Sequence, residues 1–331
     1  MRLGLLSSVQ LLLFLLVTLS LALVSVSAWP DHFGRLDTDH LWLTHLTLEL
    51  ASIFVSVSIV AILFQRVDET KSRLTNTIIF SFTTIALLDY IHSLSYQGMP
   101  VFITESSTEK AIFFWLSSRT LELMAMVAIS FHLKLHGHKL IWLSAAMLLA
   151  AVIGYIGLYH LDSFPVTYIS GTGVTQFKTN FEYILFIGNS VLALIFLKQY
   201  KHSYRGQYLY FAGSCYAMAL CALTLTNYAT PSDYSLLIGH LFKILSAVFI
   251  YRAIYWTELK RPYQLARLAE AKIHKKDVEL NTILSNIPLG IMRFDSSFNY
   301  LYINPYMQNI SLIFDTCLLY TSPSPRDGLL S

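Results

Sequence analysis

Charged residues are scarce in this sequence. Asp, Glu, Lys and Arg make up 13% of its 331 residues, whereas hydrophobic residues make up 55%. A soluble domain normally has about 25% charged residues, so the composition argues against a soluble globular fold. The net charge of +3 is too small for a nucleic-acid-binding surface, and we predict no nucleic-acid partner. The three cysteines have neither the spacing of a zinc site nor the number that a disulfide framework needs.

The apolar residues are concentrated in runs of about 20, the length that crosses a hydrocarbon core. The first run follows Met1 and Arg2 and also fits a cleavable signal peptide, but we favour an uncleaved span. The fold class that we predict is an all-α polytopic membrane bundle with about eight transmembrane helices. Its spans are 5–27, 41–64, 76–97, 111–133, 140–159, 180–197, 207–228 and 234–256.

The distribution of Lys and Arg predicts the orientation, because cytoplasmic loops are enriched in both. Every second connection between the runs is rich in basic residues, for example Arg66, Lys71 and Arg73. The intervening connections have only Arg35, Lys110 and Lys178. We therefore predict a multi-pass protein of the bacterial inner (cytoplasmic) membrane, with its C-terminal end in the cytoplasm and the lipid bilayer as a partner.

Ionisable residues within transmembrane spans are costly and usually mark a function. Here they occur in pairs three or four residues apart, which places both members on one helix face. The pairs are His45/Glu49, Asp89/His92, Arg119/Glu122 and His240/Lys243. At a rise of about 1.5 Å per residue, all eight fall roughly 6–16 Å below the outer surface. We predict that they share one polar pocket in the outer half of the bundle, with Glu182 and Asn189 beside it.

Three interpretations of this group remain open at this point. The pairs, such as Asp89 with Arg119, could act only as structural ion pairs that stabilise the bundle. They could instead form a sensory pocket for an unknown small ligand or for protons. We predict no cofactor, but a metal ion is a further possibility, because imidazole and carboxylate groups suit several first-row metals. Its ligands would be His45, Glu49, Asp89 and His92.

Residues 40–256 resemble the membrane-associated sensor domains of the MASE class, specifically its third type. The resemblance rests on His45 and Glu49 in THLTLEL, on DYIHSLSYQGMP (Asp89 to Pro100), and on SSRTLEL around Arg119 and Glu122. It implies an N-terminal sensory module of a bacterial signalling protein. Such modules usually precede PAS domains and then a histidine kinase or a diguanylate cyclase, so it implies two-component or cyclic-di-GMP signalling.

After Trp256 the sequence becomes charged and amphipathic. A repeat of one apolar residue in every seven predicts a connector helix that pairs two copies of the chain in a parallel coiled coil. The repeat consists of Leu259, Ala266, Ile273, Leu280 and Ile287. The companion heptad position contains Pro262 and Lys276, and the same helix could instead lie against anionic lipid.

Residues 287–316 resemble the start of a PAS domain. An apolar strand at Gly290–Phe294 and a second strand at Tyr300–Ile303 precede a helix that Asn304 is expected to cap. This segment is too short to bury a core of its own. Residues 317–331 contain CLLYTSPSPRD, which resembles one reading frame of a transposase-type sequencing adapter, so we interpret them as a cloning or assembly scar.

The function that we predict is an N-terminal membrane sensory input module, which passes an extracytoplasmic or intramembrane signal through the connector to PAS and output domains. The alternative is a secondary transporter or proton relay. A metal-dependent intramembrane enzyme would need a helical His-x-x-x-His or His-Glu-x-x-His motif, which the spans lack, so we predict no catalytic residue and no enzyme activity for this chain. The segments are a first span or signal anchor (1–28), the sensor domain (29–256), the connector helix (257–286), the truncated PAS start (287–316) and the artefactual tail (317–331).

Overall fold

The computed structural model describes residues 41–65, 74–226, 234–296 and 300–313, together with Thr18 and Ser20. The described residues are mostly helical and include two small two-stranded sheets. They fall into two units, 1–260 and 261–331. Apart from Thr18 and Ser20, the first predicted span lies outside the described residues, as does the tail at 317–331.

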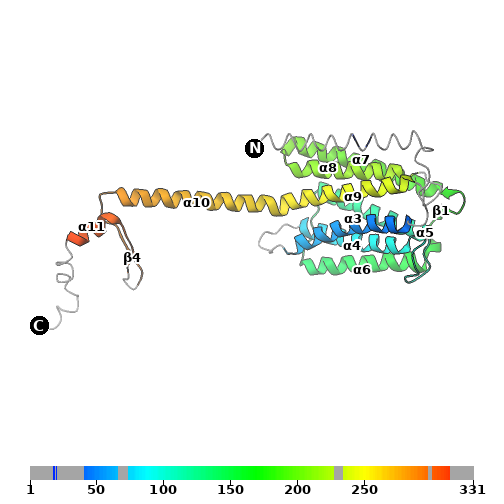
Figure 1. Ribbon diagram of the computed structural model, residues 1–331, viewed down its shortest axis with the longest axis horizontal. Helices are drawn as coiled ribbons and strands as arrows, with labels where there is room; N and C mark the ends of the chain where they lie inside the picture. Colours follow the sequence, from blue (N-terminus) through cyan, green and yellow to red (C-terminus); the bar gives the residue numbers. More distant parts are fainter. Residues whose placement is uncertain are drawn as a thin grey trace. The chain divides into compact units, whose positions relative to one another are not determined.

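Seven long helices make up the described part of the first unit (Figure 1). They are α3 (Leu41–Phe64), α4 (Leu74–Ser95), α5 (Thr108–Ser130), α6 (Lys139–Tyr159), α7 (Gln176–Ser203), α8 (Gly206–Thr224) and α9 (Tyr234–Tyr255). In the described residues, six helices are long and apolar enough to cross a membrane, and α8 is not among them. Seven of the eight predicted spans fall in the described residues, so the predicted number is one too high there, and the span that fails is 207–228. Small and polar residues in GQYLYFAGSCYAMALCALT make α8 less apolar, yet they let it pack closely between α7 and α9.

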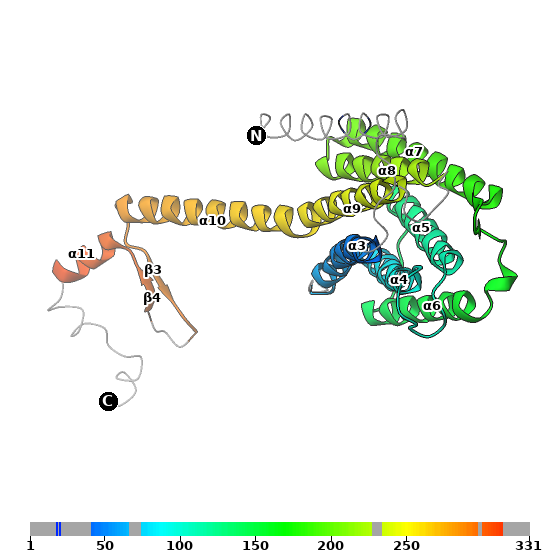
Figure 2. The ribbon, with the colours of Figure 1, turned by 45° about the vertical axis from the view of Figure 1, so that its right-hand side comes forward.

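Consecutive helices pack side by side as α3 with α4, α4 with α5, α7 with α8 and α8 with α9 (Figures 1 and 2). Contacts of α3 with α9 and of α5 with α7 join these pairs into one bundle. Helix α6 lies at the periphery against α4 and buries only four residues, Ala146, Ala150, Gly154 and Gly157. Such small residues allow close helix contact: a Cβ atom on Gly157 would lie 2.6 Å from ring atoms of Phe113 and Phe114.

The loop between α4 and α5 is closed by hydrogen bonds. The Ser107 N–H donates to the Ser95 carbonyl at 3.0 Å, and the Thr108 hydroxyl donates to the side-chain oxygen of Gln97 at 2.6 Å. Within the Ser-Tyr-x-Gly-Met-Pro run, Gly98 has a φ of +94°, a conformation that glycine adopts without strain. The loop therefore has a defined shape at the end of the bundle where α5 begins.

A short hairpin, β1 (Tyr168–Ile169) and β2 (Gly173–Val174), lies between the 3₁₀ turn η2 (Leu161–Ser163) and α7. Helix α7 begins at Gln176, before the predicted start at 180, because the Thr175 hydroxyl accepts the N–H of Lys178 as a cap. Lys178 is thus a buried helical residue, and its predicted place in an outer loop is wrong.

The second unit contains α10 (Arg261–Asn286), the antiparallel strands β3 (Met292–Phe294) and β4 (Tyr300–Ile303), and α11 (Pro305–Ile313). The predicted strands and the cap at Asn304 are confirmed: Asn304 Oδ1 accepts the N–H of Met307 at 3.1 Å and that of Ile291 at 2.9 Å. No residue of α10 is buried. That 287–316 begins a PAS domain stays a prediction.

Candidate functional site

Four helices contribute to a chain of buried ion pairs in the bundle, which we call the ion-pair network: Glu49, Lys243, Asp89, Arg119 and Glu122. Arg119 Nη2 on α5 donates to both carboxylate oxygens of Asp89 on α4, at 2.7 and 2.8 Å, and its Nη1 donates to Glu122 Oε2 at 2.5 Å. Lys243 Nζ on α9 lies 2.5 Å from Oε2 of Glu49 on α3 and 3.0 Å from Oδ2 of Asp89. Each of the five residues is at most 6% exposed.

The network alternates in charge, which offsets much of the cost of burying ions. Its three carboxylates face two cations, so it carries one excess negative charge when every group is ionised. Two hydroxyls add to it: Ser118 donates to Asp89 Oδ1 at 2.6 Å, and Ser246 donates to Glu122 Oε1 at 3.5 Å. The pairs fix α3, α4, α5 and α9 relative to one another.

Three histidines lie beside the Glu49 end of this network: His45 on α3, His92 on α4 and His240 on α9. The ring centroid of His45 is 4.6 Å from that of His240 and 5.2 Å from that of His92. One ligand atom from each histidine and one from Glu49 lie within 4.8 Å of one another, so these four residues could hold a metal ion. Asp89, which the sequence placed in the metal set, is instead bound by Arg119 and Lys243, and His240 takes its place.

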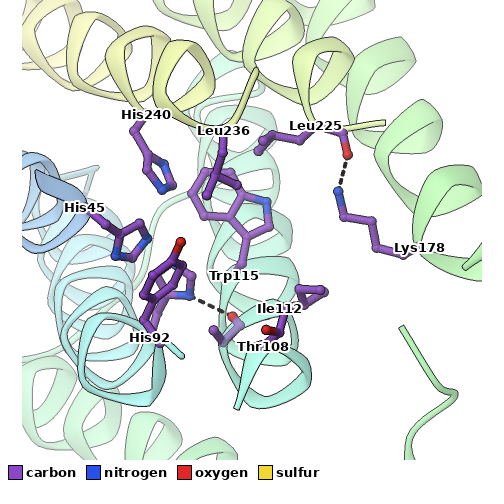
Figure 3. A pocket seen from close by; sticks show the side chains of 11 residues that line it. His45, His92, Thr108, Ile112, Trp115, Lys178, Leu225, Leu236 and His240 are labelled. Atoms are coloured by element: carbon purple, nitrogen blue, oxygen red, sulfur yellow. Dashed lines mark hydrogen bonds between the residues drawn. The ribbon is translucent and has the colours of Figure 1, made fainter. Parts of the chain in front are cut away.

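The histidines line a cavity of about 30 Å³, which is room for an ion or one or two waters. Figure 3 shows His45 and His240 projecting into it from neighbouring helices, with Trp115 across the cavity. The Tyr96 ring also lines it and stacks on His45 at 3.8 Å between centroids.

Trp115 and Lys178 belong to the site although the sequence did not mark them. Trp115 Nε1 donates to Glu182 Oε1 at 3.1 Å, and its ring lies 5.0 Å from the Arg119 guanidinium carbon and 5.2 Å from Lys243 Nζ. Lys178 Nζ lies 3.1 Å from Glu182 Oε1 and also donates to the Leu225 carbonyl. Lys178 and Glu182 are four residues apart, which places them on one helix face. This spacing could have identified their ion pair from the sequence.

The structure brings together all eight residues of the predicted pocket, and each of them is buried. It also divides them by role. His45, His92 and His240 line the cavity, whereas Asp89, Arg119, Glu122 and Lys243 form the network next to it, and Glu49 touches both groups. Asn189 donates to the Leu185 carbonyl of its own helix and lies near Arg119 and Glu182, around a gap in the packing that is too small for a water molecule.

A bundle of apolar helices around a buried polar site is the architecture of an integral membrane protein with an internal cavity. The family profile of MASE3, a membrane-associated sensor domain, matches residues 36–262, which is more than half of the chain. The chain therefore belongs to the MASE3 family of membrane-associated sensor domains, and all eight predicted site residues lie in the matched range. Neither the curated proteins nor the solved structures contain a match.

Proposed function

We propose that this chain is the N-terminal sensory input module of a bacterial signal-transduction protein, whose parent is a histidine kinase or a diguanylate cyclase. The signal acts from outside the cytoplasm or from within the membrane, at the histidine-lined cavity. The connector helix then passes it to cytoplasmic PAS and output domains. This chain itself carries out no chemistry under this proposal, because the output domain is the catalytic part.

One observation carries the proposal: α9 contributes two residues to the site and leads along the chain directly into the connector helix. His240 and Lys243 lie in its first half, and its last residue, Tyr255, is followed directly by the π-helical turn η3 (Trp256–Lys260) and then by α10. Lys243 contacts Glu49 on α3 and Asp89 on α4 at once. A rotation or shift of α9 therefore cannot occur without exchanging or breaking one of these ion pairs.

Discrete pairings of this kind give the bundle distinct packing arrangements rather than a continuous range. A ligand biases such arrangements only by its difference in affinity for them, and couplings of about 1–3 kcal/mol are typical. The π-helical turn is a suitable place for a change in helix register, since such turns occur mainly at functional sites.

The test begins with the coding sequence downstream of Asp315 in the source DNA, which identifies the output domain. The parent protein is then placed in proteoliposomes, and its kinase or cyclase activity is compared for wild type, Lys243→Met and Glu49→Gln. We expect both variants to shift the basal output, whereas Lys201→Met, at an exposed position at the end of α7, leaves it unchanged. Unchanged output from folded Lys243→Met and Glu49→Gln would contradict the proposal. Proton flux across the same liposomes would support the transporter alternative.

A further inference from the structure

We propose that His45, His92, His240 and Glu49 bind one divalent transition-metal ion. Each residue offers one ligand atom, and the four atoms lie within 4.8 Å of one another. They come from three helices, the consecutive α3 and α4 and the distant α9. Three imidazoles with one carboxylate suit Zn²⁺, Fe²⁺, Ni²⁺ and Cu²⁺ better than Mg²⁺ or Ca²⁺, which prefer sites made of oxygen atoms alone.

The hydrogen bonding of these residues supports the proposal. Both ring nitrogens of His45 and of His240, Nε2 of His92 and Oε1 of Glu49 are buried and have no hydrogen-bond partner among the described residues. Buried polar atoms are normally satisfied, so several unsatisfied ones that converge on one point need an explanation. A cation bound between them would satisfy one atom of each residue.

The protonation of His92 makes the argument more specific. Its Nδ1 lies 2.7 Å from the Ala111 carbonyl oxygen, which only accepts, so Nδ1 carries the proton. In the neutral ring, Nε2 then presents a lone pair toward Glu49 Oε1, 3.9 Å away. Two acceptors that face each other in a buried site repel unless a positive centre lies between them, either a proton on one of them or a metal ion. A histidine bound to a backbone carbonyl through its other nitrogen is also the usual arrangement in metal sites.

The distances are close to those of a formed site. With metal–ligand bonds of about 2.0–2.1 Å in a tetrahedral site, neighbouring ligand atoms are roughly 3.3–3.4 Å apart. Oε1 of Glu49 lies 3.6 Å from Nδ1 of His240 and 3.9 Å from Nε2 of His92. These two contacts need to shorten by a few tenths of an ångström, whereas the widest pair of the four ligand atoms, which all lie within 4.8 Å, needs side-chain rotations of up to about 1.4 Å. Three of the four ligands, the histidines, also line the cavity of about 30 Å³.

The charge of the surroundings also favours a cation. The ion-pair network has one excess negative charge when it is fully ionised, and the three histidines are neutral when they coordinate a metal. Glu49 can serve both groups at once, since its Oε2 accepts from Lys243 while its Oε1 remains for the metal. Lys243 thereby orients the carboxylate, as hydrogen-bonding partners of metal ligands commonly do.

The ion would tie α9 to α3 and α4, next to the network that links the same helices. Metal binding as such does not depend on the sensory function. The role of the metal as the signal, or as a permanent part of the site, does rest on the proposed function. The experiment below therefore measures binding without any output domain.

The test uses the full chain, purified with an affinity tag that has no histidine, stripped with a chelator and reconstituted in lipid nanodiscs. After equilibration with Zn²⁺ and removal of free metal, elemental analysis gives the zinc content per chain. We expect one tightly bound ion in wild type and in His160→Gln, a control at an exposed histidine. We expect a background level in the double variant His92→Gln/His240→Gln.

A second measurement needs no variant, in case the double variant does not fold. Stripped wild type is titrated with Co²⁺, and a nitrogen- and oxygen-bound ion of low coordination number gives intense visible absorption that Zn²⁺ abolishes. Absence of retained Zn²⁺ and of this absorption in wild type would overturn the metal site, as would full zinc retention in a folded double variant. The chain could bind zinc while the activity of the parent protein does not respond to the site variants. That result would support the metal site and contradict only the proposed function.

Discussion

Arg119 holds Asp89 through a single nitrogen: Nη2 donates to both carboxylate oxygens, at 2.7 and 2.8 Å. Nη1 is thereby left for Glu122, at 2.5 Å. Asp89 also contacts Lys243, so each member of the pair has a second partner of opposite charge. The two residues are nevertheless not equivalent, because the network has one more carboxylate than cations. Loss of Arg119 increases the charge imbalance, whereas neutralisation of Asp89 removes it.

We therefore expect Arg119→Met to lower the free energy of unfolding by about 3–5 kcal/mol, the usual cost of breaking a buried pair, and Asp89→Asn to cost less. The double variant should recover only part of the loss, because Glu122 remains without Arg119. Thermal and denaturant unfolding in detergent, arranged as a double-mutant cycle, measures this. Equal costs for the two single variants would show that the charge imbalance has no effect on stability.

The close contact of α6 with the bundle at Gly157 leads to a second prediction. A Cβ atom at this position would lie 2.6 Å from ring atoms of Phe113 and Phe114, so Gly157→Ala should destabilise the protein by about 1–3 kcal/mol. The matched control is Gly206→Ala, where no atom lies within 4 Å of the new Cβ. Because alanine favours helices, the control should be neutral or stabilising. Similar melting temperatures for the two variants would contradict tight packing at Gly157.

Periodicity and charge predicted most of the helices and eight of the residues that gather at the site. Spacings of three or four residues placed His45 with Glu49 and Arg119 with Glu122 on common helix faces, and their depth placed the pairs at one level. Helix α5 starts at Thr108, where Ser107 caps it, and not at the predicted 111. Glu122 therefore lies roughly 21 Å along the helix from its first residue.

What the sequence could not give was the order of the helices around the bundle. The choice of His240 rather than Asp89 beside the other histidines depends on the packing of α9 against α3, between residues almost 200 positions apart. The same holds for Trp115. In the sequence it is one aromatic residue in an apolar run, and only the packed bundle shows that it contacts Glu182, Arg119 and Lys243. Hydrophobic pattern fixes the depth of a residue in a span, but not its partner on another helix.

Asn304 leads to a prediction for the second unit. Its Nδ2 donates to the carbonyls of Leu284 and Leu289, at 3.0 and 2.9 Å, while its Oδ1 accepts the N–H groups of Ile291 and Met307. Asn304→Ala leaves these backbone groups without a partner, and each costs about 1–3 kcal/mol if it stays buried. We expect local opening of 287–313, seen as faster hydrogen exchange at the Ile291 and Met307 amides.

Two further variants separate the interactions of Asn304. Asn304→Asp keeps the acceptor but loses both donated bonds, so its exchange rates should lie between those of wild type and Asn304→Ala. Asn286→Ala is the control, because the side chain of Asn286 donates only to the Thr282 carbonyl of its own helix. If the Ile291 and Met307 amides of Asn304→Ala exchange no faster than those of this control, the structure of 287–313 does not depend on the hydrogen bonds of the Asn304 side chain.

The connector helix gives the last prediction, which concerns the homodimer that we propose. Ile273 belongs to the apolar seven-residue repeat and is 61% exposed in the single chain, so a partner helix can cover it. In a parallel coiled coil, residues at this heptad position face each other across the axis, whereas Lys275 points outward. With Cys317 changed to Ser, and with Cys215 and Cys221 buried, Ile273→Cys should form an intermolecular disulfide in membranes several-fold faster than Lys275→Cys. Non-reducing gels after mild oxidation measure both rates. Equal rates would indicate that the disulfides form by random collision, which would contradict the coiled-coil dimer. The connector would then be a single helix, as expected if it lies against anionic lipid.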